Sequence, residues 1–445
     1  MKDHRCLVCD TKGKDNWENV DQYRIKPSGM VICKNCGFVT YERVLGQDNK
    51  SLKSYYETDY RKPPTINNLY TGQRKLNYHA AFLNDLLDDW DKEQENPMER
   101  GKGKEIFEVG AAYGIVLNWI KKQFPKANVK GTEWTKSFKR NAWHEYGVEL
   151  VDEFEDDKKY DLIMSYKVAE HQIDADEELR KYALSLKENG KVYVSVPQWF
   201  GELNNFGMSG FDIEYYFHPD HINAWTREHF EHVLRKAGLK VIKKDHTLYD
   251  STYLCVRDDA VMINNNFSMD YKDIIKKLEA IKKADEMLGK NDFVGAIEVY
   301  PNFPIAHTNR YELNRKKFHD MGLEKMEKEV IEVGIRCCPE CPDMYGMAAD
   351  IYMRYDKWDQ ALKMLDTALG MRPGVEKFMI SAATCLMKMA TNEKDVKERN
   401  RLLLEAKNVL LTCKSTSLQA LPQCTDMIYK INSTLPTPNE ATTLS

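Results

Sequence analysis

Four cysteines near the amino terminus form two pairs with the spacing of metal ligands. Cys6 and Cys9 make one C-x-x-C, and Cys33 and Cys36 make the other. A C-x-x-C turn places two thiolates together, and zinc takes four such ligands in a tetrahedron. Gly37 follows the second pair, where backbone amides must approach the sulfurs closely. The spacing therefore predicts a structural zinc site with all four cysteines as ligands; two accidental pairs of reduced thiols are the alternative.

The residues between the two pairs are expected to form a short hairpin. Its first strand holds Tyr23 and Ile25, its turn covers residues 27–29, and its second strand holds Val31 and Ile32. A segment this small has little core of its own, so the metal would supply much of its stability. Residues 1–45 are therefore predicted to form a zinc ribbon. Its basic and acidic residues nearly cancel, which favours a mixed solvated surface over one that binds nucleic acid.

A second group of residues has the pattern of a nucleotide-binding turn. An apolar strand carries Glu108 and leads into Gly110, Ala112 and Gly114. A glycine turn after the first strand lets a ligand approach the backbone, and an acidic residue at the end of the second strand binds ribose hydroxyls. Glu133 ends the second expected strand, about 23 residues after the first glycine. A tight strand–helix connection without a ligand is the alternative.

This turn needs an alternating scaffold of strands and helices to position it. From about residue 101 to residue 258, short apolar runs alternate with amphipathic segments, which is typical of an α/β fold with a doubly wound parallel sheet. The expected strands cover 105–109, 129–132, 160–165, 191–196, 239–242 and 251–256. The expected helices begin at about 115 and cover 136–146, 178–186 and 227–237.

The turn departs from the dinucleotide-binding fingerprint, which would have glycine where this chain has Ala112. Its E-x-G-x-x-x-G pattern, made by Glu108, Gly110 and Gly114, resembles that of class I S-adenosylmethionine-dependent methyltransferases. In that family the turn binds the methionine half of the cofactor. The resemblance implies a cofactor-binding role for these residues, with a turn slightly narrowed by the alanine.

The same resemblance implies roles for residues near the second strand. The acid that ends this strand binds the ribose in the family, and here it is Glu133. Trp134 would lie beside the adenine, and Asp152 would meet the adenine amino group. S-adenosyl-L-methionine is thus the expected cofactor, alongside the structural Zn²⁺.

Further segments extend the resemblance over roughly residues 6–257. They are residues 55–61, 160–163, 168–171, 187–191, 196–197, 217–222, 225–226 and 234–239. The subgroup they resemble consists of small-molecule methyltransferases with an amino-terminal zinc ribbon, several of which act on sugars or sugar nucleotides. The resemblance therefore implies a Rossmann-like methyltransferase domain at 101–260, joined to the ribbon by a helical linker or cap at 46–100.

Three histidines are candidates for a catalytic base. Methyl transfer requires donor and acceptor to be aligned, and a hydroxyl or carbon acceptor also needs a base near the carboxyl ends of the strands. His171 follows the expected strand at 160–165, and His218 and His221 lie on a late loop. A histidine titrates near neutral pH and suits this task. The alternative for His171 is that it caps the next helix or holds its loop.

Beyond residue 266 long amphipathic helices replace the strands. A 34-residue period relates Tyr311 to Tyr345 and Pro339 to Pro373, and the small and large residues between them follow the spacing of tetratricopeptide repeats. Residues 268–430 are therefore predicted to form tetratricopeptide-like helical repeats, with 431–445 as a disordered tail. Such repeats bind protein partners, pack on the catalytic domain or associate with a second copy.

Composition bounds the remaining choices. The chain has 445 residues, 42% of them hydrophobic, and a net charge of -4, which gives no general attraction to nucleic acid or anionic membranes. It has no apolar run long enough to span a bilayer and no signal peptide, so a cytoplasmic location is expected. The expected function is methylation of a small polar acceptor, with a sugar, sugar nucleotide or glycan precursor as the leading candidate. A non-catalytic interaction scaffold and a methyltransferase acting on a protein are the alternatives.

Overall fold

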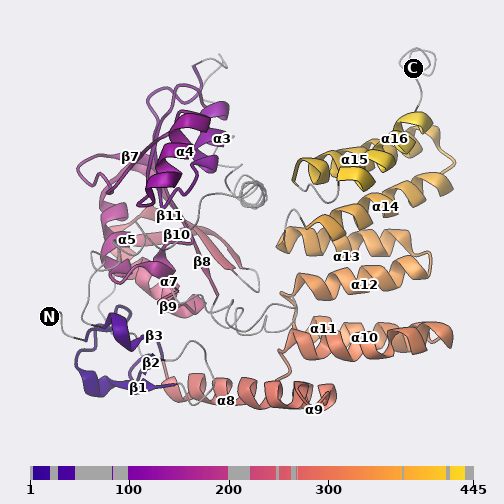
Figure 1. Ribbon diagram of the computed structural model, residues 1–445, viewed down its shortest axis with the longest axis horizontal. Helices are drawn as coiled ribbons and strands as arrows, with labels where there is room; N and C mark the ends of the chain where they lie inside the picture. Colours follow the sequence, from indigo (N-terminus) through magenta and orange to yellow (C-terminus); the bar gives the residue numbers. More distant parts are fainter. Residues whose placement is uncertain are drawn as a thin grey trace. The chain divides into compact units, whose positions relative to one another are not determined.

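The computed structural model describes residues 4–20, 29–45, 83, 99–198, 221–246, 250–261, 267, 269–372, 375–416 and 421–435. The chain divides into two compact units (Figure 1). One comprises Met1–Pro64 with Asn84–Ile305, and the other comprises Thr65–Leu83 with Ala306–Ser445. Apart from residues 83, 99 and 100, the predicted linker at 46–100 lies outside the described residues.

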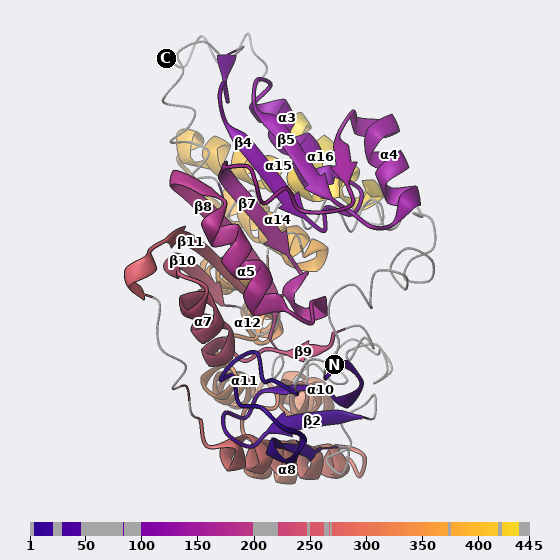
Figure 2. The ribbon, with the colours of Figure 1, turned by 90° about the vertical axis from the view of Figure 1, so that its left-hand side faces the viewer.

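A seven-stranded sheet forms the centre of the first unit, in the order β10-β11-β8-β7-β4-β5-β6. Its strands are β4 (Glu105–Val109), β5 (Asn128–Thr132), β6 (Glu149–Val151), β7 (Tyr160–Tyr166), β8 (Leu186–Pro197), β10 (Leu239–His246) and β11 (Asp250–Arg257). Helices α3 (Ile115–Gln123) and α4 (Lys136–Tyr146) pack near β5 and β6, whereas α5 (Ala175–Leu184) and α7 (Arg227–Lys236) pack against β8, β10 and β11. Figure 2 shows α5 and α7 along the sheet. The predicted α/β scaffold is confirmed.

The predicted doubly wound parallel sheet is mixed, because its strand β11 is antiparallel. The strands from β6 to β8 are parallel, but β11 pairs antiparallel with both β8 and β10. Only three residues separate His246 from Asp250. A parallel pair needs a crossover of about a dozen residues, so this short connection allows only an antiparallel hairpin.

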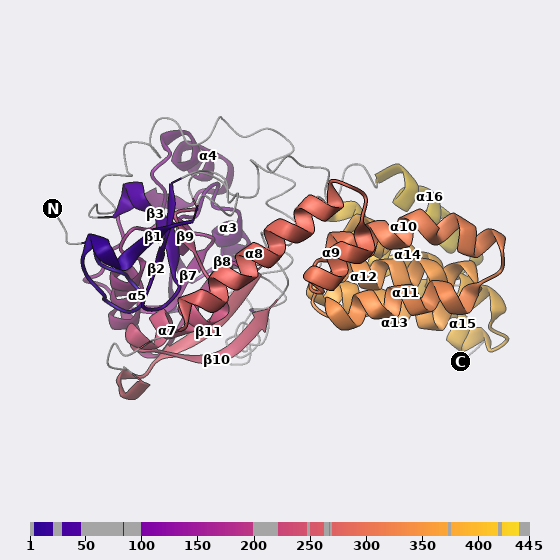
Figure 3. The same cartoon turned by 90° about the horizontal axis from the view of Figure 1, so that it is seen from below.

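The ribbon forms a second, smaller sheet in the order β1-β2-β3-β9. Its strands are β1 (Trp17–Asn19), β2 (Met30–Cys33), β3 (Val39–Tyr41) and β9 (Asn223–Ala224), flanked by 3₁₀ turns η1 (Lys14–Asn16) and η3 (Glu42–Val44). Val31 and Ile32 lie in β2 as predicted, whereas Tyr23 and Ile25 lie outside the described residues. The strand paired with β2 is β1. Figure 3 shows β9, which lies between β8 and α7 in the chain, beside the ribbon strands.

One hydrophobic core joins the ribbon to the larger sheet. It contains all four ribbon cysteines and Phe38, together with Phe107 of β4, Trp225 and Phe230. The rings of Phe38 and Trp225 are 5.0 Å apart, and those of Trp225 and Phe230 are 5.1 Å apart. Because these side chains are buried together, the ribbon and the sheet are parts of one packed body.

The rest of the chain is helical. Helices α8 (Tyr271–Leu288) and α9 (Phe293–Val299) belong to the first unit, which therefore extends past the predicted boundary at 268. The others are α10 (Pro304–Asp320), α11 (Glu324–Cys337), α12 (Pro342–Arg354), α13 (Trp358–Met371), α14 (Glu376–Asn392), α15 (Val396–Thr416) and α16 (Leu421–Thr434). Figure 1 shows the helices α10 to α16 packed side by side.

Small residues allow these helices to approach one another. A Cβ on Gly334 of α11 would lie 2.9 Å from Met344 Sδ, and one on Gly346 would lie 2.3 Å from a ring carbon of Phe378. The predicted disordered tail is wrong at its start, because α16 continues to Thr434; residues 436–445 lie outside the described part. None of the described helices combines the length and apolar character that a membrane crossing requires.

Candidate active site and metal centre

The loops after β4 and β7 leave the sheet at its topological switch point. From β4 the chain proceeds outward through β5 to β6, and it then returns to β7 on the opposite side of β4. The strands β4 and β7 are parallel neighbours, so their carboxyl ends meet at one edge. Open α/β sheets bind ligands in the crevice outside such an edge.

The turn after β4 has a left-handed backbone at three positions. The φ angles are 67° at Gly110, 48° at Ala112 and 70° at Gly114. The Gly110 N–H donates to Thr132 Oγ1 over 3.1 Å, which ties the turn to the end of β5. A Cβ on Gly110 would lie 2.7 Å from Val168 Cγ2, in the loop after β7. Only glycine therefore fits where the two loops meet.

Glu108 places a buried carboxyl group immediately before this turn. Its residue is 6% exposed, and its Oε2 has no hydrogen-bond partner among the described residues. Burial, and then the charge of Glu133, raise the pKa of Glu108 to about 8. A buried carboxyl group with one unpartnered oxygen is suited to a cationic ligand, which would restore its ionised form. S-adenosylmethionine carries an ammonium and a sulfonium charge, so this group fits the expected cofactor.

The residues with expected ribose and adenine roles cluster at the ends of β5 and β6. Glu133 follows β5, and its Oε1 accepts a hydrogen bond from the Thr135 N–H over 2.8 Å. The indole of Trp134 donates to the backbone oxygen of Asp152 over 2.8 Å, which brings these two residues together. The carboxylate of Asp152 is exposed and forms an ion pair with Lys139.

The loop after β7 carries His171 in a 3₁₀ turn, η5 (Ala169–His171). His221 lies against it, with ring centroids 4.8 Å apart and the rings edge-on. Nitrogen atoms of both histidines and a carboxylate oxygen of Glu170 lie within 4.8 Å of one another. Glu170 is 1% exposed, and its Oε1 is 3.9 Å from His171 Nε2. Two of the three candidate histidines are thus together, and His218 lies outside the described residues.

Glu170 was not among the predicted site residues. The adjacent Glu-His pair was visible in the sequence, but an acidic residue in a polar loop is expected to be exposed. Its burial comes from the turn η5, which directs it into the protein. A buried carboxylate near an imidazole stabilises the protonated ring, so Glu170 belongs with His171 in the candidate site.

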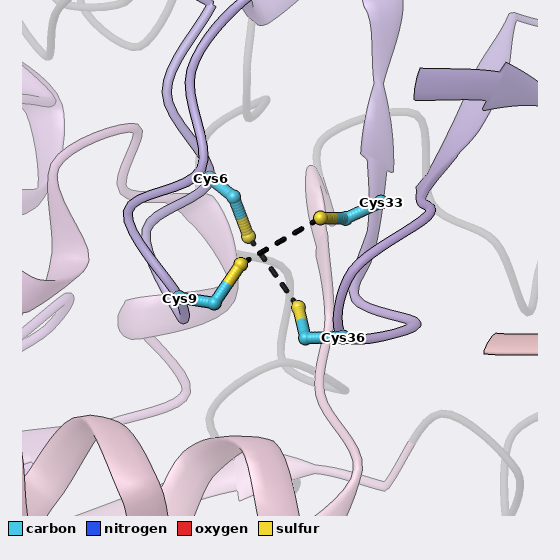
Figure 4. A group of neighbouring side chains, drawn as sticks. All are labelled: Cys6, Cys9, Cys33 and Cys36. Carbon is cyan, nitrogen blue, oxygen red and sulfur yellow. Dashed lines mark hydrogen bonds between the residues drawn. The ribbon is translucent and has the colours of Figure 1, made fainter. Parts of the chain in front are cut away.

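The four ribbon cysteines form the candidate metal centre (Figure 4). The sulfur of Cys6 is 3.6 Å from that of Cys36, and the sulfur of Cys9 is 3.7 Å from that of Cys33. All four residues are at most 5% exposed. Zinc with four sulfurs at about 2.3 Å requires sulfur–sulfur distances of roughly 3.8 Å. The cluster is therefore compatible with a zinc ion, and its four soft ligands leave no open coordination position.

The two C-x-x-C turns have matching backbones. The N–H of Asp10 donates to Cys6 O over 2.9 Å, and the N–H of Gly37 donates to Cys33 O over 2.8 Å. Asp10 and Gly37 both have positive φ, 57° and 76°. The glycine also leaves room for α8, because a Cβ there would lie 2.9 Å from Ile274 Cγ1.

Comparison with known proteins agrees with the geometry of the larger sheet. Residues 79–244 match the family model described as a methyltransferase domain. No curated protein sequence matches the chain significantly.

Solved structures of methyltransferases share parts of the fold. One is the complex of the Haloferax volcanii Trm112 methyltransferase activator with a methyltransferase: 15% identity, 42% of this chain, 97% of that chain, TM-score 0.31. Another is the plantazolicin methyltransferase BpumL in complex with a monoazolic desmethylPZN analog and SAH. It is 13% identical, covers 43% of this chain and 89% of its own, and has a TM-score of 0.36. A third is an S-adenosylmethionine-dependent methyltransferase from Clostridium acetobutylicum. It is 12% identical, covers 41% of this chain and 98% of its own, and has a TM-score of 0.29.

Likenesses this weak identify neither an acceptor nor a partner. The family match, by contrast, covers the turn after β4, the strand β5 and the loop with His171. Residues 79–244 of the chain therefore match a methyltransferase domain.

Proposed function

We propose that the chain transfers the methyl group of S-adenosylmethionine to a small polar acceptor, with His171 as the general base. The observation that carries the proposal is the set of groups at the switch point. The buried carboxyl group of Glu108 lies on β4, and the left-handed turn follows that strand. Glu133, the acid expected to bind the ribose, follows β5. The cluster of Glu170, His171 and His221 lies at the loop after β7.

The cofactor would be held by the turn and by the ends of β4 and β5. The left-handed turn from Gly110 to Gly114 lets the backbone approach the methionine half, and Glu108 faces the ammonium or sulfonium charge. Glu133 Oε2 remains to accept from ribose hydroxyls, since Oε1 orients on Thr135. Trp134 supplies a flat apolar surface for the adenine. When bound, the cofactor supplies an electrophilic methyl group on sulfur.

His171 would remove the proton of the acceptor. Its ring lies against that of His221, which limits its rotation, and Glu170 stabilises the imidazolium that forms. Because a charged ring beside a buried carboxylate is favoured, the proton remains on His171 until it is released to solvent. Resemblance to the zinc-ribbon subgroup makes sugar-linked acceptors the first to test.

The ribbon and the helical unit have supporting roles in this proposal. Zinc on Cys6, Cys9, Cys33 and Cys36 would be structural, because four buried thiolates saturate it. The starts of α11 and α13, at 324 and 358, are 34 residues apart, as are those of α12 and α14, at 342 and 376. This spacing is that of tetratricopeptide-like repeats, and the unit would bind a protein partner or a second copy.

Calorimetric titration of S-adenosylmethionine tests the proposal. The zinc-loaded wild type should bind with micromolar affinity, and Glu133→Ala should bind about 10- to 100-fold more weakly, since it loses hydrogen bonds to a charged group. Glu149→Ala, which removes an exposed carboxylate from the neighbouring strand β6, is the matched control and should bind normally. Absence of binding by a well-folded wild type would overturn the proposal.

Acceptor specificity can then be measured through formation of S-adenosylhomocysteine with a panel that begins with nucleotide sugars. His171→Asn should abolish turnover while leaving cofactor affinity intact, because the residue lies on the loop after β7 and not on the turn after β4. Unchanged turnover in this variant would remove His171 from the mechanism.

A further inference from the structure

Asn223 lies between the ribbon and the loop that carries Glu170 and His171. It is one of the two residues of β9 and is 4% exposed. Its side-chain amide donates to Ala169 O over 2.9 Å and to Gln172 O over 2.6 Å. These carbonyls stand on either side of Glu170 and His171. A single buried amide thus clamps both ends of the turn that carries the candidate base.

The same clamp fixes the second histidine. His221 is two residues before Asn223, so the amide that holds the loop after β7 also sets the position of the chain beneath His221. The 4.8 Å ring contact between His171 and His221 joins the same two segments that the Asn223 amide connects.

The ribbon in turn holds β9. Thr40 of β3 pairs with Asn223 in the antiparallel ladder, and Val39 pairs with Ala224. The hydroxyl of Thr40, which is 3% exposed, donates to Ile222 O over 2.7 Å. β3 begins three residues after Cys36, so the ladder extends from the metal-binding turn to the clamp.

A second connection runs from the metal-binding turn to the residues after β9. The Nε2–H of His229 donates to Cys36 O over 2.7 Å, and its Nδ1 accepts from the Thr226 hydroxyl at 3.0 Å. The carbonyl acceptor requires Nε2 to carry the proton, which fixes the tautomer. Thr226 caps α7 through the His229 N–H. Both ends of the segment 222–226 are therefore attached to the ribbon.

We propose that Asn223 is a positioning residue for methyl transfer, and that the metal-bound ribbon acts on the reaction by holding Asn223. Its amide sets the relative position of His171 and His221, while the turn after β4 has a hydrogen bond of its own to Thr132. The role of His171 as base rests on the proposed function; the clamp itself does not.

The substitution Asn223→Asp tests this proposal, because a carboxylate of the same shape cannot donate to the two carbonyls. Hydrogen exchange read by mass spectrometry should show exchange of residues 167–173 accelerated about tenfold or more. Exchange in α12 to α14 should remain unchanged, and the dissociation constant for S-adenosylmethionine should change less than about threefold. Asn128→Asp is the matched control, because it makes the same change at an exposed amide. The Asn128 side chain donates to Glu105 at the start of β5, away from residues 167–173, so exchange there should not change.

Two further measurements separate positioning from loss of folding. Thr40→Val keeps a β-branched strand residue and removes only the hydroxyl bond to Ile222, so it should accelerate exchange at 167–173 in the same direction, by a smaller factor. In wild type, the ring resonances of His171 and His221 should show mutual contacts by NMR that weaken in Asn223→Asp. Removal of zinc from the wild type with a chelator should reproduce both effects.

Unchanged exchange at 167–173 in Asn223→Asp would overturn the proposal, as would acceleration spread equally over the helices of the second unit. If the wild type binds no S-adenosylmethionine while the exchange and NMR results hold, the proposed cofactor site fails and the clamp stands. Once an acceptor is known, Asn223→Asp should lower kcat, shift its pH profile and leave KM for the cofactor unchanged.

Discussion

Glu108 and Glu133 lie on adjacent parallel strands, and the charge of Glu133 contributes to the raised pKa of Glu108. Glu108 pairs with Gly131 across the ladder between β4 and β5, two residues before Glu133. Burial is the larger cause of the shift. A cation bound beside Glu108 would lower its pKa again and favour its ionised form.

Cofactor binding is expected to release a proton. With its pKa raised to about 8, Glu108 is mostly protonated at pH 7, and a bound cation lowers that pKa. The association constant should therefore rise with pH up to about 8, with a slope approaching one proton. Calorimetric titrations at pH 7 in buffers of different ionisation enthalpy measure the proton directly.

The substitution Glu108→Gln should eliminate the proton release and weaken binding, and it should also stabilise the cofactor-free protein. Between pH 4.5 and about 8 the folded protein retains a proton that the unfolded chain has lost, so the stability contribution of Glu108 falls as pH rises. The gain from Gln should be on the order of 1–3 kcal/mol at pH 7 to 8 and vanish near pH 4.5. A gain in unfolding free energy over wild type that is no larger at pH 8 than at pH 5 would contradict this.

The turn after β4 should distinguish steric exclusion from backbone strain. Gly110→Ala should lower the free energy of unfolding by about 2–3 kcal/mol, because the new Cβ meets Val168 at 2.7 Å and also adopts positive φ. Gly103→Ala is the matched control: φ is 79° but nothing lies within 4 Å of its Cβ, so a loss of about 1 kcal/mol is expected. Urea unfolding curves measure both, and equal losses would refute the steric argument.

Ala112→Gly tests the departure from the glycine expected at this place in the turn. Relief of the left-handed backbone at φ 48° offsets the entropy that glycine adds to the unfolded chain, so stability should change by less than about 1 kcal/mol. Cofactor affinity should be unchanged or modestly higher. A marked loss of binding would show that the alanine methyl group contacts the cofactor.

The ribbon should bind one zinc ion per chain. X-ray absorption should show four sulfur neighbours at about 2.3 Å. Cys36→Ser should lower the zinc content and the melting temperature, because the ribbon shares a core with the larger sheet. Cys337→Ser, a partly exposed cysteine on α11, should change neither. Full zinc content in the first variant would contradict the assignment of Cys36 as a ligand.

The buried carboxylate of Asp176 forms ion pairs with Arg5 of the ribbon and with Lys236 of α7, and these pairs should stabilise the folded protein. Asp176 of α5 accepts from Arg5 at 2.9 Å and from Lys236 at 3.0 Å, with its side chain 4% exposed. Asp176→Asn leaves two cations poorly compensated and should cost about 1–3 kcal/mol, since Asp10 still contacts both. Glu177→Gln is the control: its carboxylate is exposed and 3.7 Å from Arg5, so a change below about 0.5 kcal/mol is expected by thermal unfolding.

Much of the larger sheet was predictable because its strands are apolar runs of five or more residues. The bounds of β4 and α4 match the predicted ranges. β6 and β9 were missed, since strands of three and two residues carry no periodicity. β11 was found as a strand, but its direction, antiparallel to both β8 and β10, was not, because apolar content does not encode orientation.

The candidate site was only partly predictable, for a related reason. Cys6 and Cys36 could be grouped because zinc chemistry dictates local spacing, and the glycine turn because its strand and helix are adjacent in the chain. Asn223 was passed over, since its importance arises from contacts with residues 51 and 54 positions earlier. A buried amide that binds two carbonyls across such a distance leaves no local pattern.

The pairing of β3 with β9 has a consequence for folding during synthesis of the chain. Thr40 and Ile222 are 182 residues apart, so at about 5–20 residues per second roughly ten to forty seconds separate their synthesis on the ribosome. All four cysteines emerge at the beginning of that interval, whereas the last strand of their sheet emerges at its end. If these cysteines bind zinc as proposed, the nascent segment can take up the ion while β3 is still an open edge. On that proposal, zinc supply during translation, and not only in the finished protein, would influence whether the open edge of β3 pairs with β9 or with another chain.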